Sequence, residues 1–510
     1  MKKQGKVYLV GAGPGDPGLI TIKGLQYLRE AQVVAYDRLV DRRLLEEAPS
    51  NAELIDVGKV KGYRREQQDE INALLVEKAT EGKRVVRLKG GDPFIFGRGG
   101  EEAEALVKAG VPFEIVPGIT SAIAAPAYAG IPLTHRRVAS SVTIVSGSED
   151  PTKENSSIDW RCLATGAGTL VVLMGWESLP RIVDTLREHG MAASTPAALV
   201  QWGTEPYQRT VTGHLKDILE RGRQASLAPP VVAVFGQVVD LRDTVRWFDN
   251  KPLFGKRVLV PRTRTQASAF CRRLLEEGAD PVEIPTIEIQ PMEDFTSLDP
   301  VLASLSRYEW VIFTSTNGVE AVFQRLEQLG MDARAFGSTR VCAIGPATAS
   351  SLKARGIAAD FIPSEYISEA IVEGLGSKGL EGKHVLLLRA EEGRAALASG
   401  LSQSGAQVEE VPVYRTVVPK ESRENAMSLL SGERVDVVAF TSSSTVRNLI
   451  DLLDGDTGPL EQATVACIGP ITAQTAQEVG LKVDVVASEH TIPGLVEALA
   501  EHFSLAQSRR

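Results

Sequence analysis

The sequence predicts an α/β protein built from several doubly wound lobes. Short apolar strands alternate with helical segments along the chain, and most predicted strands end in a turn rich in glycine, serine or threonine. The second half of the chain also repeats itself. Because a chain of 510 residues is too long for one hydrophobic core, we expect about three to four domains.

Composition argues against several classes of protein. The formal net charge of −9 argues against a general nucleic-acid binder. The four cysteines, Cys162, Cys271, Cys342 and Cys467, lie far apart, which favours reduced thiols in the cytoplasm over disulfides or a zinc site. The six histidines show no metal-ligand spacing, and no segment has the length of a transmembrane helix. We therefore expect a cytoplasmic protein without a metal, nucleic-acid partner or membrane partner.

The first half is organised around a glycine-rich stretch that ends at Glu102. A predicted strand, residues 84–88, runs into Gly90-Gly91-Asp92-Pro93, and a second glycine cluster precedes a helix. Adjacent glycines let the backbone approach a ligand closely. Backbone N–H groups at such a turn suit an anionic or strongly polar ligand. The alternative is a β-α connection that is rich in glycine but binds nothing.

The N-terminal strand, residues 6–10, is followed by a second glycine loop. The order strand, Gly11-Ala-Gly13, helix from Thr21, strand and Asp37 outlines a dinucleotide site. Asp16 stands where the third glycine of that motif belongs, and Pro14 removes an N–H that a pyrophosphate would need. A nicotinamide-binding domain is therefore only the second hypothesis.

Two titratable residues follow neighbouring predicted strands. Asp37 ends the strand 31–36, and Lys59 follows the strand 53–57. Open α/β sheets bind ligands at the carboxyl ends of their strands, so this pair would supply a proton acceptor and a proton donor. The alternatives are that Asp37 caps a helix or pairs with Arg38, and that Lys59 is an ordinary solvated lysine.

Other predicted strands of this half also end in small or polar residues. Thr120 and Ser121 follow the strand 111–116, and either can cap the next helix or bond a ligand. Met174 ends the strand 169–174 and is by default a core residue. Gly203 follows the strand 197–200, and Pro230 opens the strand 231–235.

These loops occur in one specific combination. It comprises Val10-Gly-Ala-Gly-Pro-Gly-Asp-Pro17, Tyr36-Asp-Arg-Leu-Val40, Lys89-Gly-Gly-Asp-Pro93, Phe96-Gly-Arg-Gly-Gly-Glu-Glu102, Val116-Pro-Gly-Ile-Thr-Ser-Ala122 and Ala129-Gly-Ile-Pro-Leu-Thr-His135. The set closely resembles the uroporphyrinogen-III C-methyltransferase family over residues 5–248. The resemblance implies a two-lobed tetrapyrrole methylase fold that methylates uroporphyrinogen III twice with S-adenosylmethionine, giving precorrin-2.

The resemblance also implies site residues. Asp37 would accept a proton and Lys59 would donate one. The positions that would contact the cofactor are Pro14, Gly90, Gly91, Asp92, Ile95, Thr120, Ser121, Met174, Gly203 and Pro230.

The second half contains an internal repeat. Its paired segments are Gly255-Lys-Arg-Val-Leu-Val260 with Gly382-Lys-His-Val-Leu-Leu387, Phe313-Thr-Ser-Thr316 with Phe440-Thr-Ser-Ser443, and Ile344-Gly-Pro-Ala-Thr348 with Ile468-Gly-Pro-Ile-Thr472. Each copy alternates apolar strands with helices, so two doubly wound lobes follow. The hydroxyls at the strand ends would either face a cleft or act as ordinary helix caps.

These signatures, with Pro412-Val-Tyr-Arg-Thr416, resemble the uroporphyrinogen-III synthase family over residues 256–503. The resemblance implies closure of the linear hydroxymethylbilane with inversion of ring D, without a cofactor. It implies one discontinuous lobe, residues 256–287 plus 417–503, and a second lobe, residues 288–416. Residues 1–248 then form the methylase, 249–255 a linker, and 504–510 a tail.

For the synthase half, the family's catalytic candidate falls on Tyr414, whose phenol would help the departing hydroxyl leave. A linker aromatic that packs between lobes is the alternative. Thr348 is a second matched position. The carboxylate-rich substrate would be held by Arg262, Arg389, Thr314, Ser315, Ser442, Ser443 and Thr472.

The two resemblances therefore predict a bifunctional tetrapyrrole enzyme, and the methylase resemblance implies a homodimer through the methylase half. A dehydrogenase fused to a two-lobed binding module, and a non-catalytic ligand-binding pair, are the alternatives. Neither the sirohaem nor the cobalamin pathway is singled out.

Overall fold

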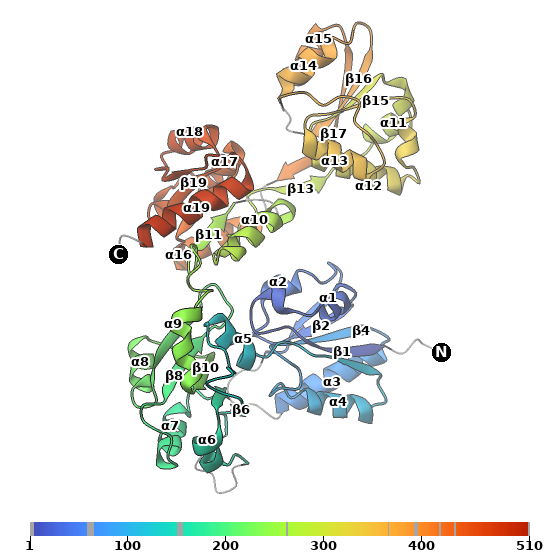
Figure 1. Cartoon of the computed structure of the whole chain (residues 1–510). Helices are drawn as coiled ribbons and strands as arrows, with labels where there is room; N and C mark the ends of the chain where they lie inside the picture. Colours follow the sequence, from blue (N-terminus) through green and yellow to red (C-terminus); the bar gives the residue numbers. More distant parts are fainter. Residues whose placement is uncertain are drawn as a thin grey trace. The chain divides into compact units, whose positions relative to one another are not determined.

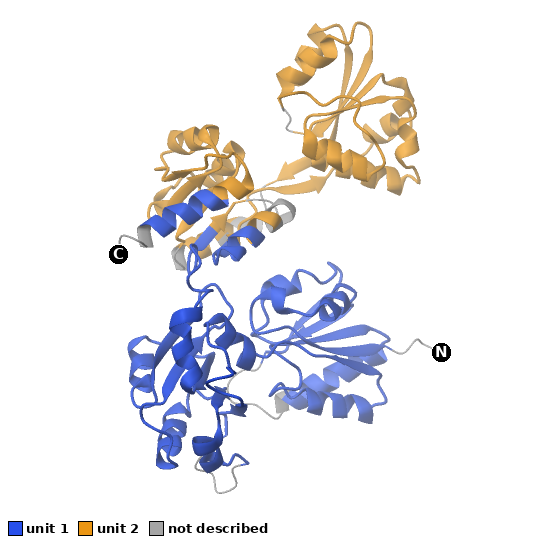
Figure 2. Ribbon diagram, viewed as in Figure 1, with its two compact units in different colours: residues 1–258, 272–281, 496–510 blue, residues 259–271, 282–495 orange. Residues whose placement is uncertain are grey.

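The computed structural model describes residues 5–58, 66–149, 157–261, 264–365, 367–391, 396–417, 420–432 and 435–507. Figure 1 shows the chain coloured along its sequence. The chain divides into two compact units, residues 1–258, 272–281 and 496–510 in one and residues 259–271 and 282–495 in the other (Figure 2). No helix within the described ranges combines the length and apolar character needed to cross a bilayer.

The first sheet has the strand order β3-β2-β4-β1-β5, and all its neighbouring strands are parallel. Its strands are β1 (Lys6–Gly11), β2 (Val33–Tyr36), β3 (Glu53–Asp56), β4 (Arg84–Lys89) and β5 (Phe113–Val116). The accompanying helices are η1 (Pro17–Leu19), α1 (Ile22–Arg29), α2 (Arg42–Leu45), α3 (Glu66–Thr80) and α4 (Gly99–Lys108). Because the strands are parallel, their carboxyl ends meet at one edge of the sheet.

The second sheet has the strand order β6-β7-β10-β8-β9. Its strands are β6 (Val142–Ser146), β7 (Thr169–Leu173), β8 (Pro196–Gln201), β9 (Arg209–His214) and β10 (Val231–Phe235). Around it lie α5 (Ser121–Tyr128), α6 (Trp160–Gly166), α7 (Leu179–Glu188), α8 (Ile218–Gln224), η2 (Gln237–Leu241) and α9 (Arg242–Val245). Strand β10 is antiparallel to both β7 and β8, so the ends of β7 and β8 and the start of β10 share one edge.

The segment after α9 packs against α5. The rings of Trp247 and Phe248 lie 5.0 and 4.8 Å from the ring of Tyr128, and the Trp247 indole N–H donates to the Ala127 carbonyl at 2.9 Å. Leu253 is fully buried. Trp247 and Phe248, just before the predicted linker 249–255, therefore pack on α5, and Leu253 within that linker is buried.

The third sheet has the strand order β12-β11-β18-β19-β20. Its strands are β11 (Arg257–Val260), β12 (Asp280–Glu283), β18 (Val437–Phe440), β19 (Thr464–Cys467) and β20 (Val485–Val486). The helices are α10 (Arg264–Glu276), α16 (Lys420–Gly432), α17 (Ser443–Leu452), η5 (Gly458–Leu460), α18 (Pro470–Glu478) and α19 (Ile492–Gln507).

The fourth sheet has the strand order β13-β17-β16-β14-β15. Its strands are β13 (Glu288–Pro291), β14 (Trp310–Phe313), β15 (Arg340–Ala343), β16 (His384–Ala390) and β17 (Gln407–Val417). Its helices are α11 (Leu298–Leu302), η3 (Leu305–Arg307), α12 (Thr316–Gln328), η4 (Ala333–Phe336), α13 (Pro346–Ala354), α14 (Ser368–Gly376) and α15 (Ala396–Gln403).

The sequence repeat is visible in the hydrogen bonds of the third and fourth sheets. Asp360 accepts from the Val341 N–H at 2.8 Å, and Asp484 accepts from the Val465 N–H at 3.0 Å. The two bonds span the same number of residues, 19 in each copy. The repeated segments therefore fold into equivalent strand–helix units.

Candidate functional site

The glycine loops of the first sheet meet at the ends of β1, β4 and β5. Gly13 and Gly91 form an isolated antiparallel bridge. A Cβ atom on Gly118 would lie 2.3 Å from the Gly91 carbonyl oxygen and 2.6 Å from the Gly11 Cα. Since real Cβ atoms do not approach so closely, residues 11 and 118 must be glycine for these loops to pack. Part of the motif therefore serves loop-to-loop contact.

Asp92 ties two of these loops together. One carboxylate oxygen accepts from the N–H groups of Phe94 and Ile95 at 2.8 and 3.1 Å, and the other accepts from the Gly118 N–H at 2.9 Å. Asp92 therefore holds the loop after β4 against the loop after β5.

Both glycines before Asp92 leave room for a ligand. Gly91 has φ of +70°, which L side chains rarely adopt. A Cβ on Gly90 would meet only the Leu39 Cβ within 4 Å, at 3.8 Å. The backbone here is open on one side, as a close-approaching cofactor requires.

Asp37 lies at the same edge, directly after β2, and is bonded to β4. The Arg87 guanidinium donates to one of its oxygens, and the Gly90 N–H donates to the other at 3.3 Å. The Asp37 side chain is 31% exposed, whereas Arg87 is 2% exposed. One carboxylate at the sheet edge is therefore fixed by a buried cation and remains accessible.

The electrostatics keep this carboxylate ionised. Burial by itself would raise the pKa of Asp37, but the positive charges of Arg87 and Lys89 and the hydrogen bonds from Arg87 and Gly90 outweigh it. The pKa of Asp37 is therefore lowered from its ordinary value.

Met174, Gly203 and Pro230, the predicted site residues of the second sheet, lie at one edge of that sheet. Trp202 N–H donates to the Pro230 carbonyl at 3.3 Å, which joins the loops that carry Gly203 and Pro230. Met174 follows β7 at this edge with φ of +54° and is 54% exposed. Such a backbone is costly for a methionine, and the Met174 side chain is exposed at the edge where the sequence predicts a cofactor contact.

Contacts connect the edges of the two sheets. A Cβ on Gly203 would lie 2.3 Å from the Ala125 Cβ, in the helix that Thr120 caps with a 3.3 Å bond to the Ala122 N–H. The Asp16 N–H donates to Thr204 Oγ1 at 3.0 Å, and the Tyr128 hydroxyl donates to the Asp16 carboxylate at 2.6 Å. These contacts join the loops that carry the predicted cofactor residues.

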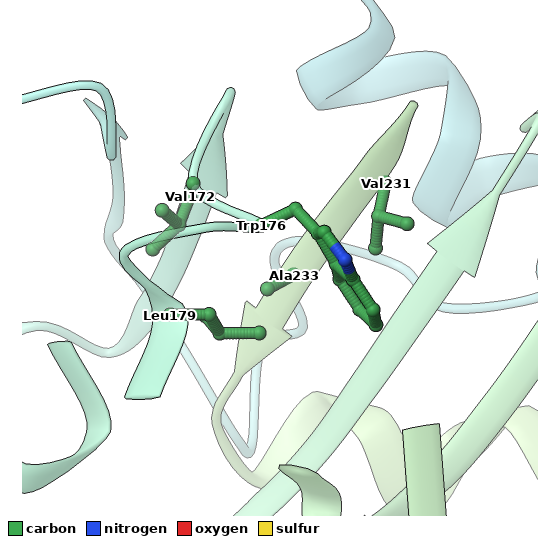
Figure 3. Close-up of a pocket in the computed structure, with 6 residues that line it drawn as sticks. Val172, Trp176, Leu179, Val231 and Ala233 are labelled. Atoms are coloured by element: carbon green, nitrogen blue, oxygen red, sulfur yellow. The ribbon is translucent and has the colours of Figure 1, made fainter. Parts of the chain in front are cut away.

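Figure 3 shows a small apolar pocket beside β7 and β10 of the second sheet. It is lined by Val172, Gly175, Trp176, Leu179, Val231 and Ala233. The Trp176 ring lies beside Val231, at the start of β10. With an apolar lining the pocket offers no acid or base, and we assign it to packing beneath the site edge.

In the fourth sheet, two predicted residues of the second half meet. The hydroxyls of Tyr414 and Ser315 lie 3.0 Å apart, and Ser315 caps α12 by accepting from the Gly318 N–H at 3.0 Å. Tyr414 is 7% exposed and belongs to the apolar core of its lobe. The neighbouring Thr314 is half-buried.

The other predicted binding residues of this half are largely engaged within the chain. Arg389 pairs with Glu410 at 2.8 Å, Thr348 and Thr472 are buried, and Thr475 donates to Ser443 at 2.8 Å. Ser442 caps α17. Lys59 and Arg262 lie outside the described residues.

Two families match the chain. Residues 6–219 match "Tetrapyrrole (Corrin/Porphyrin) Methylases" and residues 268–497 match "Uroporphyrinogen-III synthase HemD". The "Porphyrin biosynthesis protein HemD" of Ruminiclostridium josui is 38% identical over 502 residues, which cover 98% of each chain. The chain belongs to this porphyrin biosynthesis family.

Relatives of the first half alone agree. The S-adenosyl-L-methionine-dependent uroporphyrinogen III methyltransferase of Methanosarcina barkeri is 52% identical over 239 residues, 47% of this chain and 94% of that protein. A solved uroporphyrin-III C-methyltransferase of Thermus thermophilus, complexed with S-adenosylhomocysteine, is 42% identical and covers 46% of this chain and 99% of its own, with a TM-score of 0.40.

The chain is thus a bifunctional enzyme. It combines an S-adenosylmethionine-dependent uroporphyrinogen-III C-methyltransferase with a uroporphyrinogen-III synthase. The predicted fold class, function and methyl donor are confirmed, and the dehydrogenase alternative is wrong. In the structure, Asp16 occupies the third glycine position and bonds to Gly18 and Tyr128.

Sequence reasoning missed three buried charged residues, Arg87, Lys89 and Glu102. Arg87 and Lys89 lie two apart in a strand, and so on one face, and Glu102 is on α4. The signal was available, because cations within an otherwise apolar strand need a buried partner.

Proposed function

We propose that the synthase half closes hydroxymethylbilane to uroporphyrinogen III and that the methylase half then methylates this product. The order follows from chemistry, since the product of ring closure is the substrate of methylation. We place the division at residues 1–248, 249–255 and 256–503, with one synthase lobe at 256–287 plus 417–503 and the other at 288–416. The four separate five-stranded sheets support it.

The residues at the methylase edge fit S-adenosylmethionine. The open face of Gly90 and the left-handed Gly91 offer backbone at the edge of the first sheet, and the exposed Met174 offers apolar surface at the edge of the second. Pro14, Asp92, Ile95, Thr120, Ser121, Gly203 and Pro230 complete the proposed contact set. When bound, the cofactor supplies an electrophilic methyl group on sulfur, and the chain's contribution is to position donor and acceptor.

We assign Asp37 as the proton acceptor of the methylase, with Lys59 as the donor. The observation that carries this assignment is the partly exposed, ionised carboxylate of Asp37 at the ligand edge of the sheet, held by Arg87 and Gly90. Carbon methylation of a pyrrole creates positive charge in the ring. A nearby carboxylate stabilises that charge and accepts the proton that leaves.

In the synthase we assign Tyr414 as the acid that assists departure of the bilane hydroxyl. Its hydroxyl lies 3.0 Å from that of Ser315, which fixes the direction of the phenol. Thr314, Ser315, Thr348, Ser442, Ser443, Thr472, Arg262 and Arg389 are the proposed substrate-binding residues. Arg389 would have to exchange Glu410 for a substrate carboxylate.

We further propose a homodimer through the methylase half, as the family resemblance implies. Light scattering on the whole chain tests it, and a mass of one chain at working concentration would contradict it.

The test of function uses the whole chain with hydroxymethylbilane. Without S-adenosylmethionine we expect the type III isomer of uroporphyrinogen to accumulate, and with it we expect the absorption of the dimethylated product. Uroporphyrinogen III supplied directly should be methylated at once. Product of type I alone would contradict the synthase assignment, and unmethylated type III in the presence of cofactor would contradict the methylase assignment.

A further inference from the structure

Behind Asp37 lies a frame of buried charges, which we define as Arg87, Lys89 and Glu102. One oxygen of Glu102 accepts from Arg87 Nε at 3.1 Å and from Lys89 Nζ at 2.8 Å. Gln68 of α3 approaches the same oxygen at 3.4 Å. The side chains of Arg87, Lys89 and Glu102 are 2, 2 and 0% exposed. Each charge of the frame is therefore shielded from water.

Such a frame is a poor way to gain stability alone. Removing charges from water is costly, and apolar residues of similar size often stabilise a core as well or better. The second oxygen of Glu102 is buried without a hydrogen-bond partner among the described residues, which adds to the cost. A buried network kept at this cost is a candidate for function.

The frame connects the buried interior to Asp37. Arg87 bonds to Glu102 on its inner side and to Asp37 on its outer side. Asp37 is the one member of this group of four that reaches solvent, and it adjoins Gly90 of the cofactor loop. With two cations and two anions the group is neutral as a whole. A change of charge at Glu102 or Lys89 must therefore change the electrostatic environment of Asp37.

We propose that Glu102 and Lys89 are positioning residues of the methylase, which act through Arg87 to hold the Asp37 carboxylate in its working geometry by keeping the buried group electrically neutral. The inference rests on the proposed role of Asp37. It extends the site inward, to residues that touch neither substrate nor cofactor.

The proposal predicts opposite responses to pH. The charged groups that face Asp37 are Arg87 and Lys89 of β4 and, through them, Glu102 of α4; Gln68 of α3 is neutral. In Glu102→Gln, two cations face one anion, and neutrality returns when Lys89 loses its proton. In Lys89→Met, two anions face one cation, and neutrality returns when Glu102, the fully buried carboxyl that is not the proton acceptor, gains a proton.

Burial and the charge of Arg87 already lower the pKa of Lys89, and Glu102 opposes that shift. Removing Glu102 therefore lowers the pKa of Lys89 further. Methylation by Glu102→Gln should be slowed about tenfold near neutral pH, the size typical for loss of a group that orients a ligand, and should recover as pH rises. Methylation by Lys89→Met should recover as pH falls.

The double variant Lys89→Met with Glu102→Gln gives the decisive test. It leaves only the Arg87–Asp37 pair, so the buried group stays neutral over the pH range in which the single variants are compared. We expect its methylation rate to exceed that of either single variant and its pH profile to follow the parent. The matched control is Glu104→Gln, an exposed position on the same helix. Ring closure by the same chain reports that each variant is folded, and S-adenosylhomocysteine affinity should stay unchanged.

Parallel pH profiles in both single variants, or a double variant slower than both, would overturn the proposal. Reduced thermal stability with an unchanged methylation rate would show that the frame is only structural. Asp37→Asn separates the two levels of inference. If that variant methylates normally, the proposed role of Asp37 fails; if it is inactive while Glu102→Gln and Lys89→Met are normal, only the positioning role fails.

Discussion

The two halves differ in what they bury. In the methylase half the buried polar residues include the charged side chains of Arg87, Lys89, Glu102, Glu205 and Arg242. In the unit made of residues 259–271 and 282–495, the buried polar residues among those the structure describes are threonines, Thr286, Thr348, Thr472 and Thr475. The methylase half therefore buries charged side chains, and the described residues of the other unit bury hydroxyls.

The difference matches the two chemistries. Methyl transfer to carbon develops positive charge, which a fixed carboxylate in a poorly solvated place stabilises strongly. Ring closure of a flexible chain depends more on bringing its ends together, for which neutral hydrogen bonds and lobe closure suffice. Substitutions in the methylase half should therefore act through charge and pH, and those in the synthase half through local geometry.

The largest effect is expected at Asp37. Asp37→Asn keeps the shape but removes the charge and the proton acceptor, so methylation should fall about a hundredfold or more. S-adenosylhomocysteine binding and ring closure should remain. Steady-state methylation of supplied uroporphyrinogen III measures the loss, and a rate within about twofold of the parent would reduce Asp37 to a structural residue.

Gly91→Val should have the second-largest effect. It changes the backbone of the proposed site, whereas Asp37→Asn changes its charge. The valine must adopt φ of +70°, which costs on the order of 1–3 kcal/mol. Cofactor affinity should therefore fall by about tenfold or more in calorimetry with S-adenosylhomocysteine, while ring closure persists.

The control for Gly91→Val is Gly110→Val. Gly110 has nearly the same φ, +68°, in the turn after α4, and a Cβ there meets nothing within 4 Å. This variant carries the backbone cost without adjoining the cofactor loop, so it should lose stability and keep affinity. Equal losses of affinity in both would show that strain, and not the site, is being measured.

A third prediction concerns Tyr414. Tyr414→Phe removes a hydroxyl and no charge, so it should slow ring closure by about tenfold with little dependence on pH, and raise the share of type I product. The isomer ratio after oxidation to porphyrins measures it.

Tyr308→Phe is the matched control for Tyr414→Phe. It removes another buried phenol of the same lobe, one that donates to Glu409 at 2.6 Å. A normal isomer ratio in Tyr414→Phe, or the same change in both variants, would contradict the assignment.

The smallest effect compares the two repeats. Ser315 and Ser442 both cap helices by accepting from the third N–H, at 3.0 and 3.3 Å, so replacing either by alanine should cost about 1 kcal/mol of stability. Ser315 alone of these two also contacts Tyr414. Ser315→Ala should therefore slow ring closure more than Ser442→Ala, which removes a proposed substrate contact but no bond to Tyr414. Chemical denaturation and ring-closure rates together test this, and equal rates would remove Ser315 from the site.

Much of the fold was predictable because most strands are unbroken apolar runs. The predicted strand 231–235 coincides with β10, and the Thr21 cap is observed at 3.1 Å from Gly24 N. Strand β6 was missed, since Val142–Ser146 is only partly buried and mixes polar with apolar residues. Periodicity and composition predict a strand less clearly where apolar and polar residues are mixed without regular alternation.

Candidate site residues could be proposed from the sequence where one loop carries the information. Gly91 and Asp37 are such candidates, because a glycine turn and an acid follow predicted strands. The frame could not be predicted from the sequence, because Arg87, Lys89 and Glu102 come into contact only when β2, β4 and α4 are folded together. Sequence also could not show that Asp92 bonds Gly118, or that Gly203 is required against Ala125.

The aromatic segment after α9 bears on how the two activities can be separated. Trp247 and Phe248 rest on Tyr128, Phe248 also contacts the ring of Phe254 at 5.4 Å, and Leu253 is fully buried. A methylase shortened to residue 246 would expose the Tyr128 ring to solvent. The exposed apolar surface would favour aggregation. One that runs to residue 254 would keep the Trp247 and Phe248 rings on Tyr128, and it would lose the contacts of Leu253 and Phe254 with Glu277 and Gly278. The natural place to divide this chain therefore lies after the aromatic segment.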